Sequence, residues 1–418
     1  MKNYILRTCD ENMKSRNNFI WPQSGPVKCE DWNPTAKCGN GLHGFLNGEG
    51  NANLISFDPD AKWIVAEIEE YIDLGGKVKF PKANVIYAGS REEAVKLIAQ
   101  LCPQAKEIIG GIATVGDEGT ATVGYKGIAT AGDDGKAIAG EAGEAIAGYN
   151  GIATAGRRGI ATAGHRGIAT AGNEGKAIAG DDGKAIVGDE GTSKAGDNGK
   201  AIAGDKGEAI VGDNGKAVAG DNGEAVAGNR STAVVGLGGI ATAGRGGIAT
   251  AGHKGIAITG DDGKAIAGDD GKAIAGDDGK AIAGDNGKAI VGDRGTAVAG
   301  LGGIAAAGRR GTATAGHRGI ATTGDEGTSK AGDKCIAKAG NDGKAIAGDD
   351  GKAIAGDRGI AVVGLGGIAA AGEGGVLQFQ WYDHENNKMQ YTIACVGKDD
   401  IKPTIRYKCV GGKIIACH

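Results

Sequence analysis

An eight-residue repeat runs without interruption through residues 116–371 and constrains the fold more than any other feature of the chain. The unit is Gly-x-x-Gly-x-Ala-x-Ala, and its 32 copies contain no insertion or deletion. The first glycine is present in every copy, and the second is replaced only by Ser231 and Cys335. Self-similarity at a fixed short period is typical of a solenoid, in which each repeat buries its apolar side by stacking on its neighbours.

The composition excludes the other common classes of glycine-rich chain. Glycine accounts for 83 of the 418 residues, far above the ~7% of an average protein, but the three-residue period of collagen is absent. Apolar residues make up 40% of the chain and the formal net charge is −4, whereas disorder usually combines few apolar residues with a high net charge. The balance of 47 basic and 51 acidic residues also argues against nucleic acid as a partner.

Within each octet, the pattern predicts a turn followed by a short strand. The Gly-x-x-Gly half predicts a polar turn whose glycines adopt positive φ. In the strand, positions 5 and 7 share one face and positions 6 and 8 share the other. Position 6 is Ala except at Ser193 and Ser329, whereas position 5 is often Lys or Glu. We therefore expect positions 6 and 8 to point inward and positions 5 and 7 outward, with the reverse assignment as the alternative.

Two octets then form one 16-residue coil, so that residues 16 apart stack and the repeat forms 16 coils. Asp261, Asp277 and Asp293 would form one ladder of like charges, which nearby lysines such as Lys264 should offset. Positions 5 and 7 also present many aliphatic side chains outward, and contiguous apolar surface usually marks an interaction site. We expect a homo-oligomer or an unidentified protein partner. The candidate binding residues are Ile138, Ile146, Ile186, Ile202, Ile266, Ile274 and Ile282.

Large aromatic residues divide the chain into three parts, because all four Trp and all five Phe lie outside the repeat. We predict an α+β domain at 1–107, the octapeptide-repeat β-solenoid at 108–375, and a β-rich C-terminal cap at 376–418. The predicted fold class is thus an all-β solenoid of 16-residue coils with a small α+β N-terminal domain and a small β-rich cap.

Local patterns support both end domains. A cap is expected because an uncovered solenoid end would pair with other chains. Ser90 is a suitable N-cap for the helix of the N-terminal domain. Alternation and turn residues predict N-terminal strands at 63–68, 77–80 and 84–87, a helix at 91–102, and C-terminal strands at 376–381, 391–396, 404–409 and 413–416.

The candidates for chemistry are few. Cys38 and His43 lie in a glycine-rich loop and could form a nucleophile and base, but we favour a structural loop with a satisfied histidine. The eight cysteines form no Cys-x-x-Cys pair and are interpreted as free thiols. The Asp-rich turns could hold Ca²⁺, but the period of eight differs from that of calcium-binding nonapeptide repeats. We expect no enzyme activity, no cofactor and no metal.

Two further patterns concern location. No apolar stretch is long enough for a transmembrane helix, and the first residues lack the apolar core of a secretory signal. The sequence therefore predicts no membrane association and a cytoplasmic protein, or a virion-associated one if it is encoded by a phage.

The octet Ala-Gly-Asp-Asp-Gly-Lys-Ala-Ile resembles the repeats of bacterial ice nucleation proteins, which also run as paired octets in a 16-residue coil. It is similar, more loosely, to the β-roll heads of trimeric autotransporter adhesins. The layout resembles uncharacterised phage and bacterial octapeptide-repeat proteins with an N-terminal domain of unknown function, on residues 38–43 and 58–63.

These resemblances imply a non-enzymatic structural or partner-binding scaffold. The alternatives are a fibre, adhesin or ice-binding protein, or an N-terminal domain that carries an activity on a solenoid spacer. Ice recognition in the first family relies on Thr-x-Thr arrays, and Thr-Ala-Thr occurs here only at 120–122 and 312–314.

Overall fold

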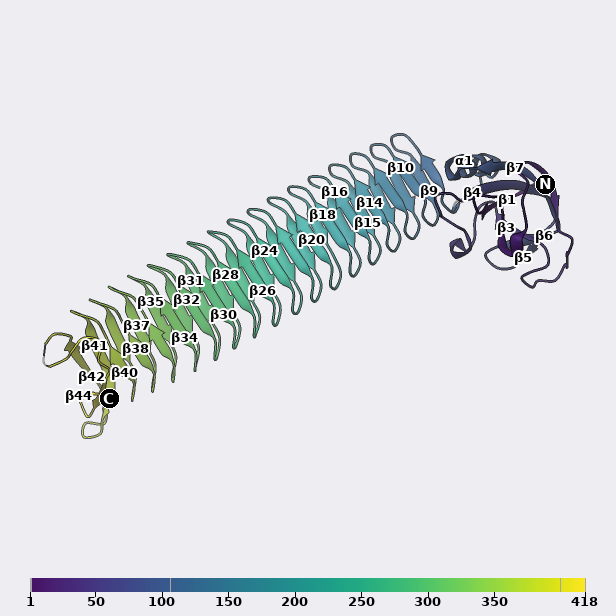
Figure 1. Ribbon diagram of the computed structural model, residues 1–418. Coiled ribbons are helices and arrows are strands. Elements are labelled where there is room, and N and C mark those ends of the chain that lie inside the picture. The colour runs from purple at the N-terminus through teal and green to yellow at the C-terminus, as the bar shows by residue number, and fades with distance from the viewer. Residues whose placement is uncertain (1, 106, 399, 418) are drawn as a thin grey trace. The chain divides into compact units, whose positions relative to one another are not determined.

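The computed structural model describes residues 2–105, 107–398 and 400–417. It comprises two compact units, residues 1–192 and 193–418. Figure 1 labels their helices and strands. The chain is an all-β solenoid of about 17 coils with 16-residue spacing, a small N-terminal α+β region and a C-terminal β cap, which confirms the predicted fold class. The sequence count of 16 coils omits a strand at Ile112–Thr114, which precedes the first octet.

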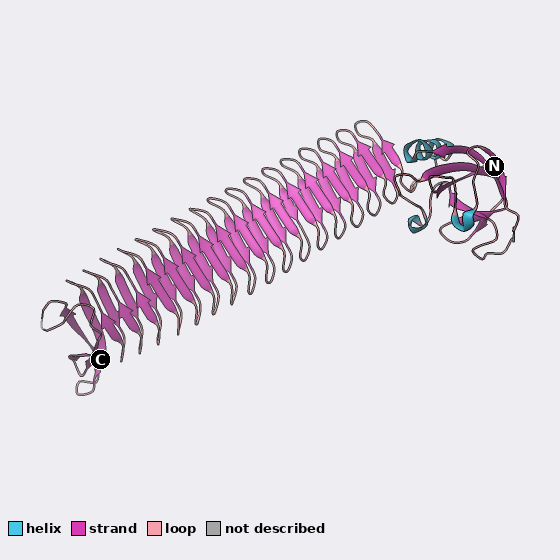
Figure 2. Ribbon diagram, in the orientation of Figure 1, coloured by secondary structure: helices cyan, strands magenta, loops and turns pink. Residues whose placement is uncertain are grey.

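The first unit begins with an antiparallel sheet and one helix (Figure 2). The sheet has seven strands in the order β2-β7-β4-β1-β3-β6-β5. Its elements are β1 (Asn3–Cys9), β2 (Gly25–Lys28), β3 (Leu42–Leu46), β4 (Lys62–Ile68), β5 (Ile72–Asp73), β6 (Val78–Phe80), β7 (Lys82–Gly89), α1 (Arg91–Leu101) and two 3-10 turns, η1 (Arg16–Asn18) and η2 (Ala52–Leu54).

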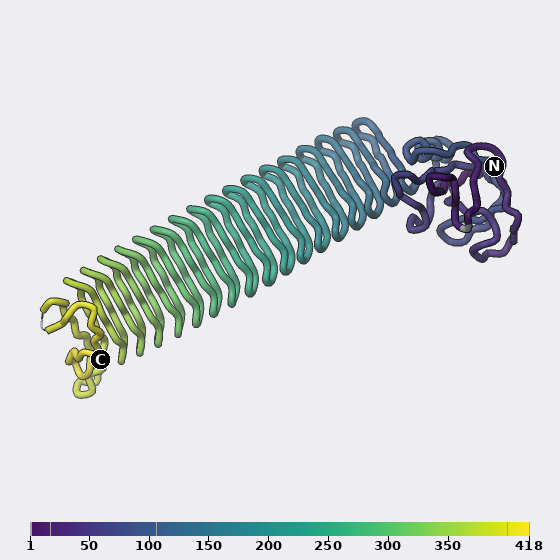
Figure 3. The backbone as a smooth tube through the Cα atoms, viewed as in Figure 1, coloured from purple at the N-terminus to yellow at the C-terminus, as the bar shows by residue number. Residues whose placement is uncertain are grey.

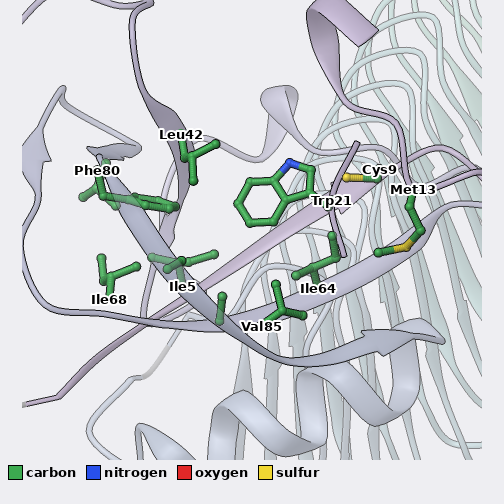
Figure 4. Packing of buried hydrophobic residues seen from close by; sticks show 12 residues of the cluster. Ile5, Cys9, Met13, Trp21, Leu42, Ile64, Ile68, Phe80 and Val85 are labelled. Atoms are coloured by element: carbon green, nitrogen blue, oxygen red, sulfur yellow. The ribbon is translucent and has the colours of Figure 1, made fainter. Parts of the chain in front are cut away.

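Both faces of this sheet are covered. Helix α1 buries Val95 and Ile98 in a cluster with Leu6 and Trp63. Trp21 and Phe80 belong to a second cluster, together with other side chains of the sheet (Figure 4). The three predicted strands and the helix are present, and the Ser90 side chain accepts from the N–H of Glu93. Strand β1 was missed because Ile5 and Leu6 are both fully buried, so the strand lacks the alternation that marks a half-exposed one.

The first unit continues with solenoid strands that alternate between two parallel sheets. Each strand pairs with the strand 16 residues later, as Lys136 pairs with Ile152. In each unit we call the solenoid strands with even numbers the even sheet and those with odd numbers the odd sheet. The strands of the first unit are β8 (Ile112–Thr114), β9 (Thr120–Val123), β10 (Ile128–Ala131), β11 (Lys136–Ala139), β12 (Glu144–Ala147), β13 (Ile152–Ala155), β14 (Ile160–Ala163), β15 (Ile168–Ala171), β16 (Lys176–Ala179) and β17 (Lys184–Val187).

The second unit repeats this arrangement, and its coils can be followed in Figure 3. Strand β18 (Thr192–Ala195) contains the boundary between the units. The others are β19 (Lys200–Ile202), β20 (Glu208–Val211), β21 (Lys216–Ala219), β22 (Glu224–Ala227), β23 (Thr232–Val235), β24 (Ile240–Ala243), β25 (Ile248–Ala251), β26 (Ile256–Thr259), β27 (Lys264–Ala267), β28 (Lys272–Ala275), β29 (Lys280–Ala283), β30 (Lys288–Val291), β31 (Thr296–Ala299), β32 (Ile304–Ala307), β33 (Thr312–Ala315), β34 (Ile320–Thr323), β35 (Thr328–Ala331), β36 (Ile336–Lys338), β37 (Lys344–Ala347), β38 (Lys352–Ile354), β39 (Ile360–Val363) and β40 (Ile368–Ala370).

The core between the two sheets is built mainly of alanine. Ala265 at position 6 is fully buried and Ala267 at position 8 is 3% exposed, and this pattern recurs along the repeat. Lys264 at position 5 is exposed and Ile266 at position 7 is partly exposed. Positions 6 and 8 therefore point inward, as expected from the intolerance of position 6 to large side chains.

The glycines of the turn have a different role from the one predicted. The residue with positive φ is the one at position 3, such as Asp262 at 58°, and within the described repeat a glycine takes positive φ only where it occupies that position. A Cβ on Gly276, at position 1, would lie 2.2 Å from Oδ1 and 2.7 Å from the backbone N of Asp261. A Cβ on Gly279, at position 4, would lie 2.8 Å from the Cβ of Ala275. Glycine is favoured at positions 1 and 4 because the chain packs closely there in most coils, although position 4 also accommodates Ser231 and Cys335.

The aspartates at position 2 form hydrogen bonds between coils. Oδ1 of Asp261 accepts from the backbone N–H of Asp277 at 2.9 Å, and Oδ1 of Asp277 accepts from that of Asp293 at 2.8 Å. Backbone donors thus contact the carboxylates of the predicted ladder. Such bonds to charged acceptors are stronger than neutral ones.

Additional structure covers each end of the solenoid within its own unit. In the first unit, Nε of Arg91 donates to the carbonyl of Gly110 at 3.0 Å, and its Nη2 donates to the carbonyl of Lys126. In the second unit, Trp381 donates to Thr392 at 3.0 Å, and β41 pairs with both β39 and β42. The strands of the cap are β41 (Val376–Asp383), β42 (Lys388–Cys395), β43 (Tyr407–Val410) and β44 (Lys413–Ala416).

Candidate functional site

The outer faces of the two sheets are the most extensive candidate surface. The seven isoleucines predicted as one binding ladder all occupy position 7 and are all partly exposed. They do not form one surface, because successive octets alternate between the even sheet and the odd sheet. Ile146 and Ile274 lie on the even sheet. The other five lie on the odd sheet, namely Ile138, Ile186, Ile202, Ile266 and Ile282.

The isoleucines at position 5 are in general more exposed than those at position 7. Ile240 on the even sheet is 39% exposed, and Ile248 on the odd sheet is 42% exposed. Sequence reasoning missed these residues because it followed the octets in which position 5 is charged.

On the even sheet of the second unit, isoleucines are present on seven successive strands, β24 to β36. Ile240 pairs with Ile256 on the next strand, and Ile258 beside it pairs with Ile274. The next isoleucine is at position 7 of β30, and on β32, β34 and β36 the isoleucines are at position 5. We call this set the isoleucine stripe: Ile240, Ile256, Ile258, Ile274, Ile290, Ile304, Ile320 and Ile336.

Cys38 and His43, the candidates in the N-terminal loop, each contact another residue. Sγ of the exposed Cys38 contacts Nζ of Lys77 at 3.1 Å. Nε2 of His43, on β3, accepts from the N–H of Gly39 at 3.5 Å. Among the described residues no hydrogen bond joins Cys38 to His43. Nε2 of His43, the nitrogen that would act as a base, already accepts from the N–H of Gly39.

The electrostatic environment of His43 is strongly positive. Burial, together with the charges of Lys77, Arg7 and Lys79, lowers the pKa of His43 from 6.5 to about 4. The ammonium of the fully buried Lys79 donates to the carbonyl of Lys37 at 2.9 Å and lies over the ring of Trp32. These contacts hold the loop against the sheet and support the structural interpretation of this segment.

Other candidate groups add no catalytic arrangement. His165 and His253 lie in turns. Nε2 of His165 is 3.4 Å from Oδ2 of Asp182, and Nε2 of His253 is 3.7 Å from Oδ2 of Asp270. All eight cysteines, each within the described residues, are free thiols. Across residues 2–105, 107–398 and 400–417, no group of three or more His, Cys, Asp or Glu is placed to hold a metal ion. None of the helices in these ranges is long and apolar enough to span a membrane.

Two hollows in the described part of the first unit have charged side chains in their linings. One, of about 660 Å³, lies over β2, β4 and β7 and is lined by the ion pairs Lys2–Glu67 at 3.1 Å and Lys82–Glu69 at 2.6 Å. The other, of about 400 Å³, is lined by residues 50–53 and by the first coils.

Comparison with known proteins matches two parts of the chain. Residues 3–97 match a family described as a domain of unknown function, DUF7666. The repeat is homologous to ice nucleation proteins. One from Xanthomonas campestris pv. translucens is 41% identical over 102 residues, which is 23% of this chain and 6% of that protein. InaU from Pantoea ananas is 40% identical over 98 residues, 22% of this chain and 10% of that protein.

These matches confirm the predicted resemblance to repeat proteins with an N-terminal domain of unknown function. The matched region spans a tenth or less of the length of either relative. No solved structure matches the chain.

The predicted location is wrong. The sequence pointed to a cytoplasmic or virion-associated protein, whereas ice nucleation proteins are anchored in the bacterial outer membrane. The prediction rested on the absence of a recognisable leader in the first residues, and the match to these relatives overturns it.

Proposed function

We propose that this chain is a non-catalytic structural protein whose solenoid presents a flat outer face to a protein partner, and that the partner is a second copy of the chain. The fold and the matched relatives are both of a non-enzymatic kind, which supports the first part. The observation that carries the second part is the isoleucine stripe, in which Ile240 and Ile290 are 39% and 37% exposed.

The physical basis is the burial of apolar surface. Isolated exposed hydrophobic residues are normal, but contiguous apolar patches of more than a few hundred Å² usually mark interaction sites. Burying them stabilises an association by roughly 25 cal/mol per Å² before the costs of association are subtracted. The stripe is carried on hydrogen-bonded strands, so little backbone order has to be gained on binding.

Sedimentation velocity of the intact chain tests this function. We expect the wild type to form a dimer at micromolar concentration and the double variant Ile240→Lys/Ile256→Lys to be monomeric. Ile248→Lys is the matched control, because Ile248 has the same octet position and similar exposure but lies on the odd sheet. A monomeric wild type, or a dimer that survives the double substitution, would contradict the proposal.

Ice binding is a second candidate, favoured by the match to ice nucleation proteins. Paired threonines occur on the outer face, as Thr154 beside Thr170. However, Thr170 pairs with Ile186 on the next strand, which ends the row of threonines. Droplet-freezing measurements with the intact chain would decide: we expect the freezing temperature of buffer alone, and a rise of several degrees would replace the scaffold function with ice nucleation.

A further inference from the structure

The charges at position 5 of the even sheet follow a self-complementary order in the second unit. Six successive strands, β20 to β30, are in continuous register through their position-5 residues. These residues are, in order, Glu208, Glu224, Ile240, Ile256, Lys272 and Lys288. Two acidic residues are thus followed by two apolar and two basic ones, so reversal of the order exchanges the acidic and basic ends.

We infer that two copies of the chain pack with these faces together around a two-fold axis that runs parallel to the strands between β24 and β26. This inference rests on the proposed self-association and names its surface and geometry. The axis reverses the order of the strands but keeps position 5 opposite position 5. Glu224 then faces Lys272 of the second copy, Glu208 faces Lys288, and Ile240 faces Ile256. A two-fold interface of this kind repeats each contact twice.

The neighbouring position 7 fits the same axis. Its residues on these strands are Ile210, Val226, Thr242, Ile258, Ile274 and Ile290. The two-fold axis places Ile210 opposite Ile290, Val226 opposite Ile274, and Thr242 opposite Ile258. No charged side chain enters this row, so an apolar row would run beside the row of ion pairs.

Electrostatics disfavours two competing arrangements. If a two-fold axis ran across the strands directly over position 5, Lys272 would face Lys272 and Glu224 would face Glu224, and like charges placed opposite each other oppose association. The odd sheet cannot pair with itself in this way. From β19 to β39 its charged residues at positions 5 and 7 are all lysine: Lys200, Lys216, Lys264, Lys280, Lys330 and Lys344. Among the faces of the described second unit, the even sheet is therefore the one with a self-complementary pattern.

Charge reversal tests the geometry. Glu224→Lys or Lys272→Glu alone would place like charges opposite each other at two symmetry-related positions. We expect either change to raise the dissociation constant of the dimer by about tenfold or more. The double variant Glu224→Lys/Lys272→Glu restores opposite charges and should return the constant to within about threefold of the wild type. Lys264→Glu, an exposed position-5 lysine on the odd sheet, is the control and should leave the constant unchanged.

Sedimentation equilibrium of the intact chain and these variants measures the effect, and circular dichroism confirms that each variant is folded. Weakening by both single changes with recovery in the double variant supports the inference. A wild-type dimer that is insensitive to the single changes, or is not rescued by the double change, overturns this geometry but leaves self-association standing. A wild type that stays monomeric overturns both this inference and the proposed function.

Discussion

Replacement of Gly284 by alanine is expected to loosen the solenoid locally, although it adds a single methyl group. A Cβ at this position would lie 2.1 Å from Oδ1 and 2.7 Å from the backbone N of Asp269, and 2.9 Å from the carbonyl carbon of Gly268. The Asp269 side chain could rotate away, but it would lose its hydrogen bond with the N–H of Asp285 at 2.8 Å. The backbone atoms can retreat only if the two coils separate.

The size of the effect follows from three contributions. Overpacking of this kind costs about 1–3 kcal/mol, and loss of one hydrogen bond costs about 1 kcal/mol. The smaller conformational freedom of alanine in the unfolded chain offsets about 0.4–1 kcal/mol of this. The net local destabilisation is therefore about 1–3.6 kcal/mol, which corresponds to about 5- to 400-fold faster opening.

Hydrogen exchange followed by mass spectrometry is the appropriate assay, because a long repeat array need not unfold in one cooperative step. We expect faster exchange in peptides that contain residues 268–288. Gly116→Ala is the matched control: Gly116 occupies the same octet position, but a Cβ there would have nothing within 4 Å. Unchanged exchange in Gly284→Ala, or equal acceleration in both variants, would refute the steric explanation for the repeat glycines.

Three further predictions use the same assay or a simple titration. Asp277→Ala should speed hydrogen exchange of the Asp293 amide, which donates to Oδ1 of Asp277. Leu301→Asp should slow exchange of the His317 amide, 16 residues later, by supplying a carboxylate acceptor. If neither rate changes, the aspartate ladder contributes little to stability. The stability of the N-terminal domain should fall as the pH is lowered from 6.5 towards 4, because the pKa of His43 in the folded state is about 4 and the unfolded chain binds the additional proton first. His43→Gln should flatten this dependence in a chemical denaturation series, and an equally steep profile would assign it to other groups. Arg91→Ala should accelerate exchange in residues 108–130, since Arg91 donates to the carbonyls of Gly110 and Lys126, whereas Glu92→Ala at the neighbouring position should not.

The sequence was sufficient for the features that depend on period and side-chain size. The restriction of position 6 to alanine and serine predicted the inward face, and the doubled octet predicted the 16-residue coil. The helix was also recognisable, because Ser90 and the apolar spacing after it are local signals. All of these features can be inferred from residues that lie close together along the chain.

The contacts between coils were not accessible in the same way. A side chain at Gly276 would clash with Asp261, which lies 15 residues earlier in the sequence but next to it in the fold. Within one octet, a glycine that avoids such a clash looks the same as a glycine that adopts positive φ. The predicted ladder, which included Ile266 and Ile274, combined two faces because successive octets were treated as equivalent, although alternate octets belong to opposite sheets. The order of charges from Glu208 to Lys288 becomes visible only when every second octet is taken.

The mass of the intact wild-type chain in solution, measured by light scattering over a series of micromolar concentrations, tests the central claim most directly. The isoleucine stripe predicts a mass that rises with concentration to twice that of one chain. A mass that stays at one chain throughout would contradict self-association as the role of this face.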